Sequence, residues 1–215
     1  MVPPPFDPDR ADEHVDAQAD AEVALARLLD ARNEHPESLA ALDGEIWRRF
    51  GTTAAVLVLD MCGFSRLTLR YGITHFLAMI RRLQVIVRPI VVNAGGRVVK
   101  TEADNVFATF DDVGAALEAA RNIMAHLAAA NAFLPEDWDL HASIGIGYGP
   151  LLQIGPDELF GSELNLASKL GEDVAGPEEI LLSEAAYARL GAGPVGAEEL
   201  IVTVSSLSLR AFRAR

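Results

Sequence analysis

The chain has 215 residues, half of them hydrophobic, and a formal net charge of −13. This length and apolar content suffice for one well-buried domain with an extension, or at most two small domains, and they exclude disorder of the whole chain. The negative charge argues against nucleic acid as a partner, because a phosphate backbone is bound by clustered lysines and arginines.

The use of cysteine and the pattern of hydropathy indicate the compartment. Cys62 is the single cysteine, which excludes an intrachain disulfide and suits a reducing environment. No uncharged apolar run reaches the roughly 18 residues that a membrane-spanning helix needs. The first residues are rich in proline and aspartate and have no signal-peptide pattern. We therefore expect a cytoplasmic protein with no membrane span.

The first 50 residues are expected to form an extension rather than a domain. Residues 1 to about 10 are predicted to be a disordered tail, and residues 12–32 an amphipathic helix. A second, shorter helix is predicted to start at Pro36 and to end at Gly51. So small a segment cannot bury a core of its own. It is therefore expected to pack on the main domain or on a second chain, as a dimerisation or regulatory element.

The main domain is expected to cover residues 51–215 as an α+β fold. Its predicted elements, in chain order, are a strand 54–59, helices 64–71 and 74–93, a hairpin of strands 97–100 and 105–110, a helix 113–130, a strand 140–146 with a short partner strand 151–154, a helix 163–172, a strand 179–182, a helix 183–190 and a strand pair within 199–213. This order is typical of a ferredoxin-like βαββαβ core, with an antiparallel sheet and covering helices.

Two aspartates mark the candidate site. Asp60 ends the first strand before a turn at Gly63, and Asp104 follows Lys100 and opens the strand 105–110. Two carboxylates at neighbouring strand ends, beside a glycine turn and a lysine, suit a hard divalent cation and a phosphate chain. The alternatives from local sequence are a helix N-cap for Asp60 and a hairpin-turn residue for Asp104.

Four segments carry a resemblance to a known family. They are residues 58–65 (VLDMCGFS), 95–104 (GGRVVKTEAD), 145–149 (GIGYG) and 160–170 (FGSELNLASKL). In order and spacing they resemble the catalytic domain of the class III nucleotidyl cyclases, the adenylyl and guanylyl cyclases. The resemblance covers roughly residues 52–185, and it implies the cyclase type of the α+β fold.

The resemblance implies a two-metal site. Asp60 and Asp104 would hold two Mg²⁺ or Mn²⁺ ions, with the main-chain carbonyl of Met61 as a further ligand. The turn that follows would offer main-chain N–H groups to the phosphates of the substrate, a role assigned to Gly63, Phe64 and Ser65.

The resemblance also implies which residues read the base. Lys100 stands where adenylyl cyclases place a lysine that contacts the purine. Glu158 stands in place of the usual aspartate, seven residues before Asn165, and the adjacent Asp157 is an alternative. A lysine with a carboxylate favours adenine, so ATP is the expected substrate, with GTP or a pyrimidine triphosphate as the alternative. The local alternative for both charged residues is a solvated surface charge.

The remaining matches concern the transition state. Asn165 matches the residue that orients the ribose, and Lys169 stands in place of an arginine on the α-phosphate, keeping the charge but losing the planar fork. Ala103 replaces the glycine usual before the second aspartate. Residues 203–210 lack the usual Lys-Gly element, for which Arg210 and Arg213 are the nearest substitutes.

The expected activity is that of an adenylate cyclase, which converts ATP to 3′,5′-cyclic AMP and pyrophosphate by two-metal-ion catalysis. Because one chain carries the signatures of both halves of the composite site, a head-to-tail homodimer with two equivalent sites is implied. The departures at Lys169, Glu158 and the C-terminus favour one alternative. In this alternative, the chain is a catalytically weak or inactive cyclase-like module with a nucleotide-binding or regulatory role.

Overall fold

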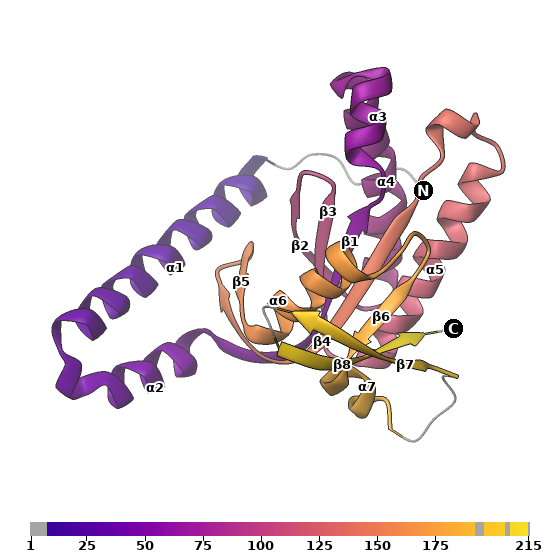
Figure 1. The fold of residues 1–215 in the computed structure, drawn as a ribbon. Coiled ribbons are helices and arrows are strands. Elements are labelled where there is room, and N and C mark those ends of the chain that lie inside the picture. Colours follow the sequence, from indigo (N-terminus) through magenta and orange to yellow (C-terminus); the bar gives the residue numbers. More distant parts are fainter. Residues whose placement is uncertain (1–7, 192–195, 205–206, 215) are drawn as a thin grey trace. The chain divides into compact units, whose positions relative to one another are not determined.

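The computed structural model describes residues 8–191, 196–204 and 207–214, as Figure 1 shows. The chain divides into two compact units, the first formed by residues 1–52 and 152–160 and the second by residues 53–151 and 161–215. Within the described ranges, no helix is long and apolar enough to cross a membrane.

The first unit is a helical hairpin packed on a small β-hairpin. Helix α1 (Pro8–Glu34) and helix α2 (Leu39–Phe50) are joined by a 3-10 turn (Pro36–Ser38) and pack on the end of strand β4 (Ala142–Ile154). Strand β5 (Glu158–Phe160) pairs with this end of β4 and completes the β-hairpin. Arg32 of α1 pairs with Asp43 of α2, which helps to hold the two helices together. The tail expected before residue 10 falls mainly on residues 1–7, outside the described residues, and α1 already includes Pro8.

The second unit contains the rest of the fold. Its elements are β1 (Gly51–Met61), α3 (Phe64–Tyr71), α4 (Ile73–Asn93), β2 (Arg97–Glu102), β3 (Asn105–Phe110), α5 (Val113–Asn131), a 3-10 turn (Glu136–Trp138), β4 (Ala142–Ile154), α6 (Ser162–Lys169), a π-helical turn (Leu170–Val174), β6 (Ile180–Ser183), α7 (Glu184–Arg189), β7 (Glu198–Val204) and β8 (Leu207–Ala214). This order confirms the predicted α+β class.

One sheet organises this unit. The strand order is β2-β3-β1-β4-β6-β8-β7, and β5 pairs with the end of β4. The pairs β1–β3, β2–β3, β6–β8 and β7–β8 are antiparallel, whereas β4 and β6 are parallel. The sheet is therefore mostly antiparallel, as expected.

Helices cover both faces of the sheet (Figure 1). On one face, Leu57 and Leu59 of β1 join a large core with apolar side chains of α4 and α5. On the other face, Leu170, Leu181 and Ala211 form a smaller core beside α6. Because β1 is buried on both sides, its sequence is a continuous apolar run rather than an alternation.

The structure corrects the prediction for residues 140–154. The two expected strands are a single strand, β4 (Ala142–Ile154), and the partner of its end is β5. The glycines at 147 and 149 resemble turn signals, but they serve close packing. A Cβ at Gly147 would lie 2.5 Å from the carbonyl oxygen of Glu163, and one at Gly145 only 2.0 Å from that of Ala167. Helix α6 thus lies directly on the strand.

The end of the predicted helix 163–172 also differs. The α-helix ends at Lys169 and continues as the π-helical turn, in which the N–H of Ala175 donates to the carbonyl of Leu170 at 2.8 Å. Such single π turns are frequent at functional sites.

Candidate active site

Asp60 and Asp104 lie at the same end of neighbouring strands. Asp60 is the second-last residue of β1, and Asp104 lies in the turn between β2 and β3. The antiparallel register of β1 and β3 places Leu59 opposite Val106, which brings the two aspartates to one edge of the sheet. The chain thus places side by side the two carboxylates that its sequence singled out.

The electrostatics of Asp60 reflect this crowding. The pKa of the Asp60 carboxyl is raised from 3.8 to about 7, first by burial and then by the negative charges of Asp104, Glu172 and Asp173. Carboxylates that repel one another bind protons or cations more readily. The edge is therefore a place of concentrated negative charge that a cation would relieve.

Glu172 and Asp173 were not among the predicted site residues. They come from the π-helical turn that follows Lys169. Burial and the charge of Asp173 raise the pKa of Glu172, although the side chain as a whole is exposed. The signal for them was weak, since acidic residues at a helix end are most often a solvated surface.

Asn105, directly after Asp104, is a second residue that the sequence did not identify. Its Nδ2 donates to Glu172 Oε1 at 3.1 Å. Its Oδ1 is buried and has no hydrogen-bond partner among the residues that the structure describes. A buried oxygen of this kind favours a nearby donor or cation.

The donor set fits a hard divalent cation. Aspartate oxygens and a main-chain carbonyl are the ligands that Mg²⁺ and Mn²⁺ prefer. In the described part of the chain, no group of three or more His, Cys, Asp or Glu side chains is arranged to hold a metal ion. Two carboxylates are still enough for Mg²⁺, which usually keeps several waters and binds substrate phosphates instead of using an all-protein cage.

The turn after Asp60 has the shape expected for a phosphate contact. Met61 buries its side chain at 1% exposure, so only its main chain is available to a ligand. Gly63 has a φ of 96° and directly precedes α3, and the N–H of Leu67 donates to its carbonyl. The main chain of Phe64 and Ser65 forms the first turn of α3, whereas their side chains lie outside what the structure describes.

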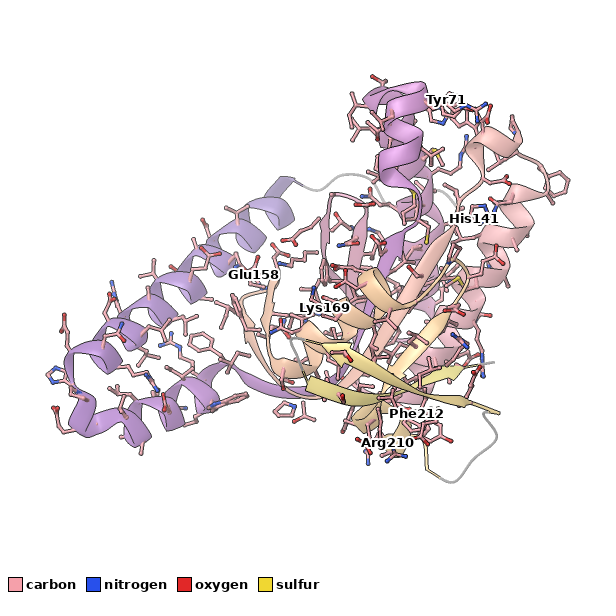
Figure 2. The ribbon with its side chains drawn as sticks, in the orientation of Figure 1. Tyr71, His141, Glu158, Lys169, Arg210 and Phe212 are labelled. Atoms are coloured by element: carbon pink, nitrogen blue, oxygen red, sulfur yellow. The ribbon has the colours of Figure 1, made fainter. Side chains whose placement is uncertain are left out.

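The predicted base-reading residues lie in different units. Lys100, in β2 of the second unit, pairs with Glu102 at 2.9 Å, and its ammonium lies 5.4 Å from the ring centre of Phe107. Glu158, labelled in Figure 2, opens β5 of the first unit and pairs in register with Ile154. Asp157 precedes it in the same hairpin.

Asn165 and Lys169 share one face of α6 because they are four residues apart. Both side chains are exposed in the single chain. Lys169, also labelled in Figure 2, donates to Asp173 Oδ2 at 2.6 Å, and this bond raises the pKa of its ammonium. The ammonium thus has an acidic partner one helical turn away.

Arg210 and Arg213, the nearest substitutes for the absent C-terminal lysine, are both engaged in ion pairs. Arg210 bridges Glu184 and Glu199, and Arg213 contacts Glu179 and Glu198. A role on a phosphate would require these pairs to break.

Comparison with known proteins gives relatives of one kind. The chain is 35% identical over 132 residues to "Putative adenylate cyclase 3" of Rhizobium meliloti (strain 1021), a match that covers 61% of this chain and 22% of that protein. It is 31% identical over 134 residues to "Adenylate cyclase" of Streptomyces coelicolor (strain ATCC BAA-471 / A3(2) / M145), covering 62% and 33%. The match thus spans a third or less of the length of these relatives. No protein-family model matches the chain.

Solved structures share the fold. An adenylate/guanylate cyclase/hydrolase from Silicibacter pomeroyi aligns with a TM-score of 0.67 at 26% identity, over 76% of this chain and 96% of that one. The catalytic core of a rhodopsin-guanylyl cyclase with converted specificity, in complex with ATPαS, aligns with a TM-score of 0.66 at 18% identity, over 77% and 98%. By sequence similarity and by fold, the chain is similar to the class III nucleotidyl cyclase catalytic domains, which confirms the resemblance carried by its four segments.

Proposed function

We propose that the chain is an adenylate cyclase, which converts ATP to 3′,5′-cyclic AMP and pyrophosphate. The observation that carries the proposal is the placement of Asp60 and Asp104 at one sheet edge, in a chain with the cyclase fold. The names of the two relatives, both adenylate cyclases, support ATP as the substrate.

Asp60, Asp104 and the Met61 carbonyl would hold two Mg²⁺ or Mn²⁺ ions. When bound, these ions neutralise the triphosphate and lower the pKa of the ribose 3′-hydroxyl. The turn at Gly63 supplies N–H groups to the phosphate oxygens, and the first turn of α3 adds its partial positive charge.

Selection of the base is assigned to Lys100 together with Glu158 or Asp157. A carboxylate accepts from the exocyclic amine of adenine, and an ammonium donates to a ring nitrogen. A guanine would present a carbonyl to the carboxylate, leaving two acceptors opposed.

Asn165 and Lys169 act on the reacting centre. Asn165 orients the ribose so that its 3′-oxygen attacks the α-phosphorus, and Lys169 stabilises the charge that develops there while the bond to pyrophosphate breaks. The exposure of both residues in the single chain supports a site that a second copy completes. We therefore propose a head-to-tail homodimer with two equivalent sites. A cytoplasmic location, where ATP is available and Cys62 stays reduced, belongs to the same proposal.

The test is an assay of ATP, GTP, CTP and UTP with Mn²⁺ or Mg²⁺, read by mass spectrometry. We expect cyclic AMP as the main product, and a loss of roughly 10²–10³-fold or more in Asp60→Asn and in Asp104→Asn. Asp111→Asn, an exposed aspartate after β3, serves as the matched control. If wild type is active and both site variants keep that activity, the metal assignment is wrong. Cyclic GMP or a cyclic pyrimidine nucleotide as the main product would instead show that the preferred substrate is GTP or a pyrimidine triphosphate.

One observation favours a second candidate, a nucleotide-binding module with little or no turnover. Lys169 stands where an arginine is usual, and Asp173 holds its ammonium at 2.6 Å. A lysine also lacks the bidentate fork that suits a phosphate. Tight binding of ATP with Mn²⁺ but no cyclic product after long incubation would select this candidate. In that case Lys169→Arg is expected to restore measurable turnover.

A further inference from the structure

The N-terminal helices and the base-reading hairpin share one hydrophobic core. Ile46 and Phe50 of α2 pack with Ile154 at the end of β4, and all three side chains are buried. Partly buried side chains of α1 and of Leu152 surround them. The hairpin that carries Asp157 and Glu158 is therefore covered by the helices within the first unit.

Gln18 of α1 makes a polar contact with the turn of the hairpin. Its Oε1 accepts from the main-chain N–H of Asp157 at 3.1 Å. Its Nε2 donates to Glu22 Oε1 at 2.6 Å, one turn along the helix. Glu22 thus orients the amide of Gln18 so that its oxygen faces the hairpin.

The turn itself leaves no space between hairpin and helix. Gly155 has a φ of 60°, and a Cβ at this position would lie 2.4 Å from Gln18 Oε1 and 2.9 Å from Gln18 Cα. Gln153 Nε2 donates to the carbonyl of Gly155 at 3.1 Å and closes the turn from within. The main chain of the turn therefore rests directly on α1.

The hydrogen bond from Asp157 to Gln18 involves one of the two candidate base-reading residues. Asp157 and Glu158 are adjacent, and a shift of the hairpin by one residue would exchange one carboxylate for the other. In the structure, Gln18 holds the N–H of Asp157 while Glu158 lies in register opposite Ile154. The N–H that is held belongs to the main chain, so the contact restrains the position of the hairpin.

We propose that Gln18, oriented by Glu22, is a positioning residue for the base-reading hairpin. Through it the N-terminal helices set how well the enzyme selects its nucleotide. The inference rests on the proposed function, because Asp157 and Glu158 read a base only in a nucleotide-binding protein. It gives the N-terminal helices a task in substrate selection, in addition to any role in dimerisation.

The test compares wild type, Gln18→Ala and a swapped pair, Gln18→Glu with Glu22→Gln. The swapped pair keeps an acceptor for the Asp157 N–H and restores the helix contact with donor and acceptor exchanged. Asp20→Ala, an exposed residue on the same helix, is the matched control. Two quantities are measured in the full chain: amide exchange of residues 153–160, and the ATP-to-GTP ratio of kcat/KM with Mn²⁺.

In Gln18→Ala we expect faster exchange of the Asp157 amide and a fall of about tenfold in the ATP-to-GTP ratio, through a higher KM for ATP with little change in kcat. The swapped pair is expected to restore both quantities, and the control to change neither. A purely structural contact would speed exchange without altering the ratio, and that outcome overturns the inference while leaving the proposed function intact.

If wild type turns over no nucleotide, the proposed cyclase activity fails, and the inference is judged by binding. The ratio of the ATP and GTP dissociation constants, measured with Mn²⁺, then replaces the kinetic ratio. A ratio that is the same in wild type and in Gln18→Ala overturns the inference, whereas a tenfold fall supports it.

Discussion

Asn105 donates a hydrogen bond to Glu172 at 3.1 Å, and this contact joins two segments that are 67 residues apart in sequence. Asn105 follows Asp104 at the start of β3, whereas Glu172 lies in the π-helical turn after Lys169. The turn that carries a proposed metal ligand is thus tied to the segment that carries a proposed transition-state residue. A residue that orients a metal ligand often matters almost as much as the ligand itself.

Loss of this contact should weaken metal binding. We expect Asn105→Ala and Glu172→Ala each to raise the dissociation constant for Mn²⁺ about tenfold or more, since the Asp104 turn loses its restraint. The double variant should add little to either single change, because both remove the same hydrogen bond. Titration followed by electron paramagnetic resonance of free Mn²⁺ measures the effect. Strictly additive changes would show that the two residues act separately.

The raised pKa of Asp60 predicts a pH-dependent stability of the metal-free protein. Since the folded pKa is about 7 and the ordinary value 3.8, the folded state binds more protons between these values. The stability that Asp60 contributes therefore falls as pH rises from about 4 to 7. Asp60→Asn should stabilise the protein at pH 8 by on the order of 2 kcal/mol, discounted for water at the site, and have little effect at pH 4.

Urea unfolding in EDTA at the two pH values measures this difference. Asp111→Asn, an exposed residue, is the control and should shift the unfolding midpoint little at either pH. An Asp60→Asn variant that is equally stable relative to wild type at pH 4 and pH 8 would contradict the crowding of charge at this edge.

Ala103 gives a third prediction, because its backbone has a φ of 49°. A side chain in this left-handed region costs about 1 kcal/mol that glycine avoids. Ala103→Gly should therefore raise the free energy of unfolding by about 1 kcal/mol. Ala125→Gly, on the exposed face of α5, should lower it by about the same amount, since helical φ and ψ favour alanine. Chemical denaturation compares the two, and a destabilised Ala103→Gly would refute the strain.

Much of the site's framework could be predicted from local sequence. Helix 64–71 and strand 105–110 have the predicted bounds, because an apolar strand, a glycine turn and an amphipathic helix each have a local signature. The position of Asp60 at a strand end followed directly. Its neighbours Glu172 and Asp173 did not, because their approach depends on the π-helical turn and on the packing of α6 against β4.

Contacts between distant segments could not be read from periodicity. Gln18 and Asp157 are 139 residues apart, and nothing in the composition of either segment indicates the other. The glycines of β4 carry two possible meanings, a turn or a close approach. Only the position of α6 in the structure, directly against Gly145 and Gly147, shows that these glycines allow a close approach and do not form a turn.

The burial of Ile154 has a consequence for shortened versions of the protein. With 1% of its surface exposed, Ile154 is covered by Ile46 and Phe50, which precede the first strand of the sheet. A fragment that begins at β1 would expose Ile154 and Leu152 to water on the hairpin of β4 and β5, and an exposed apolar surface promotes aggregation. A minimal catalytic fragment should therefore either retain α2 or carry polar substitutions at these two positions.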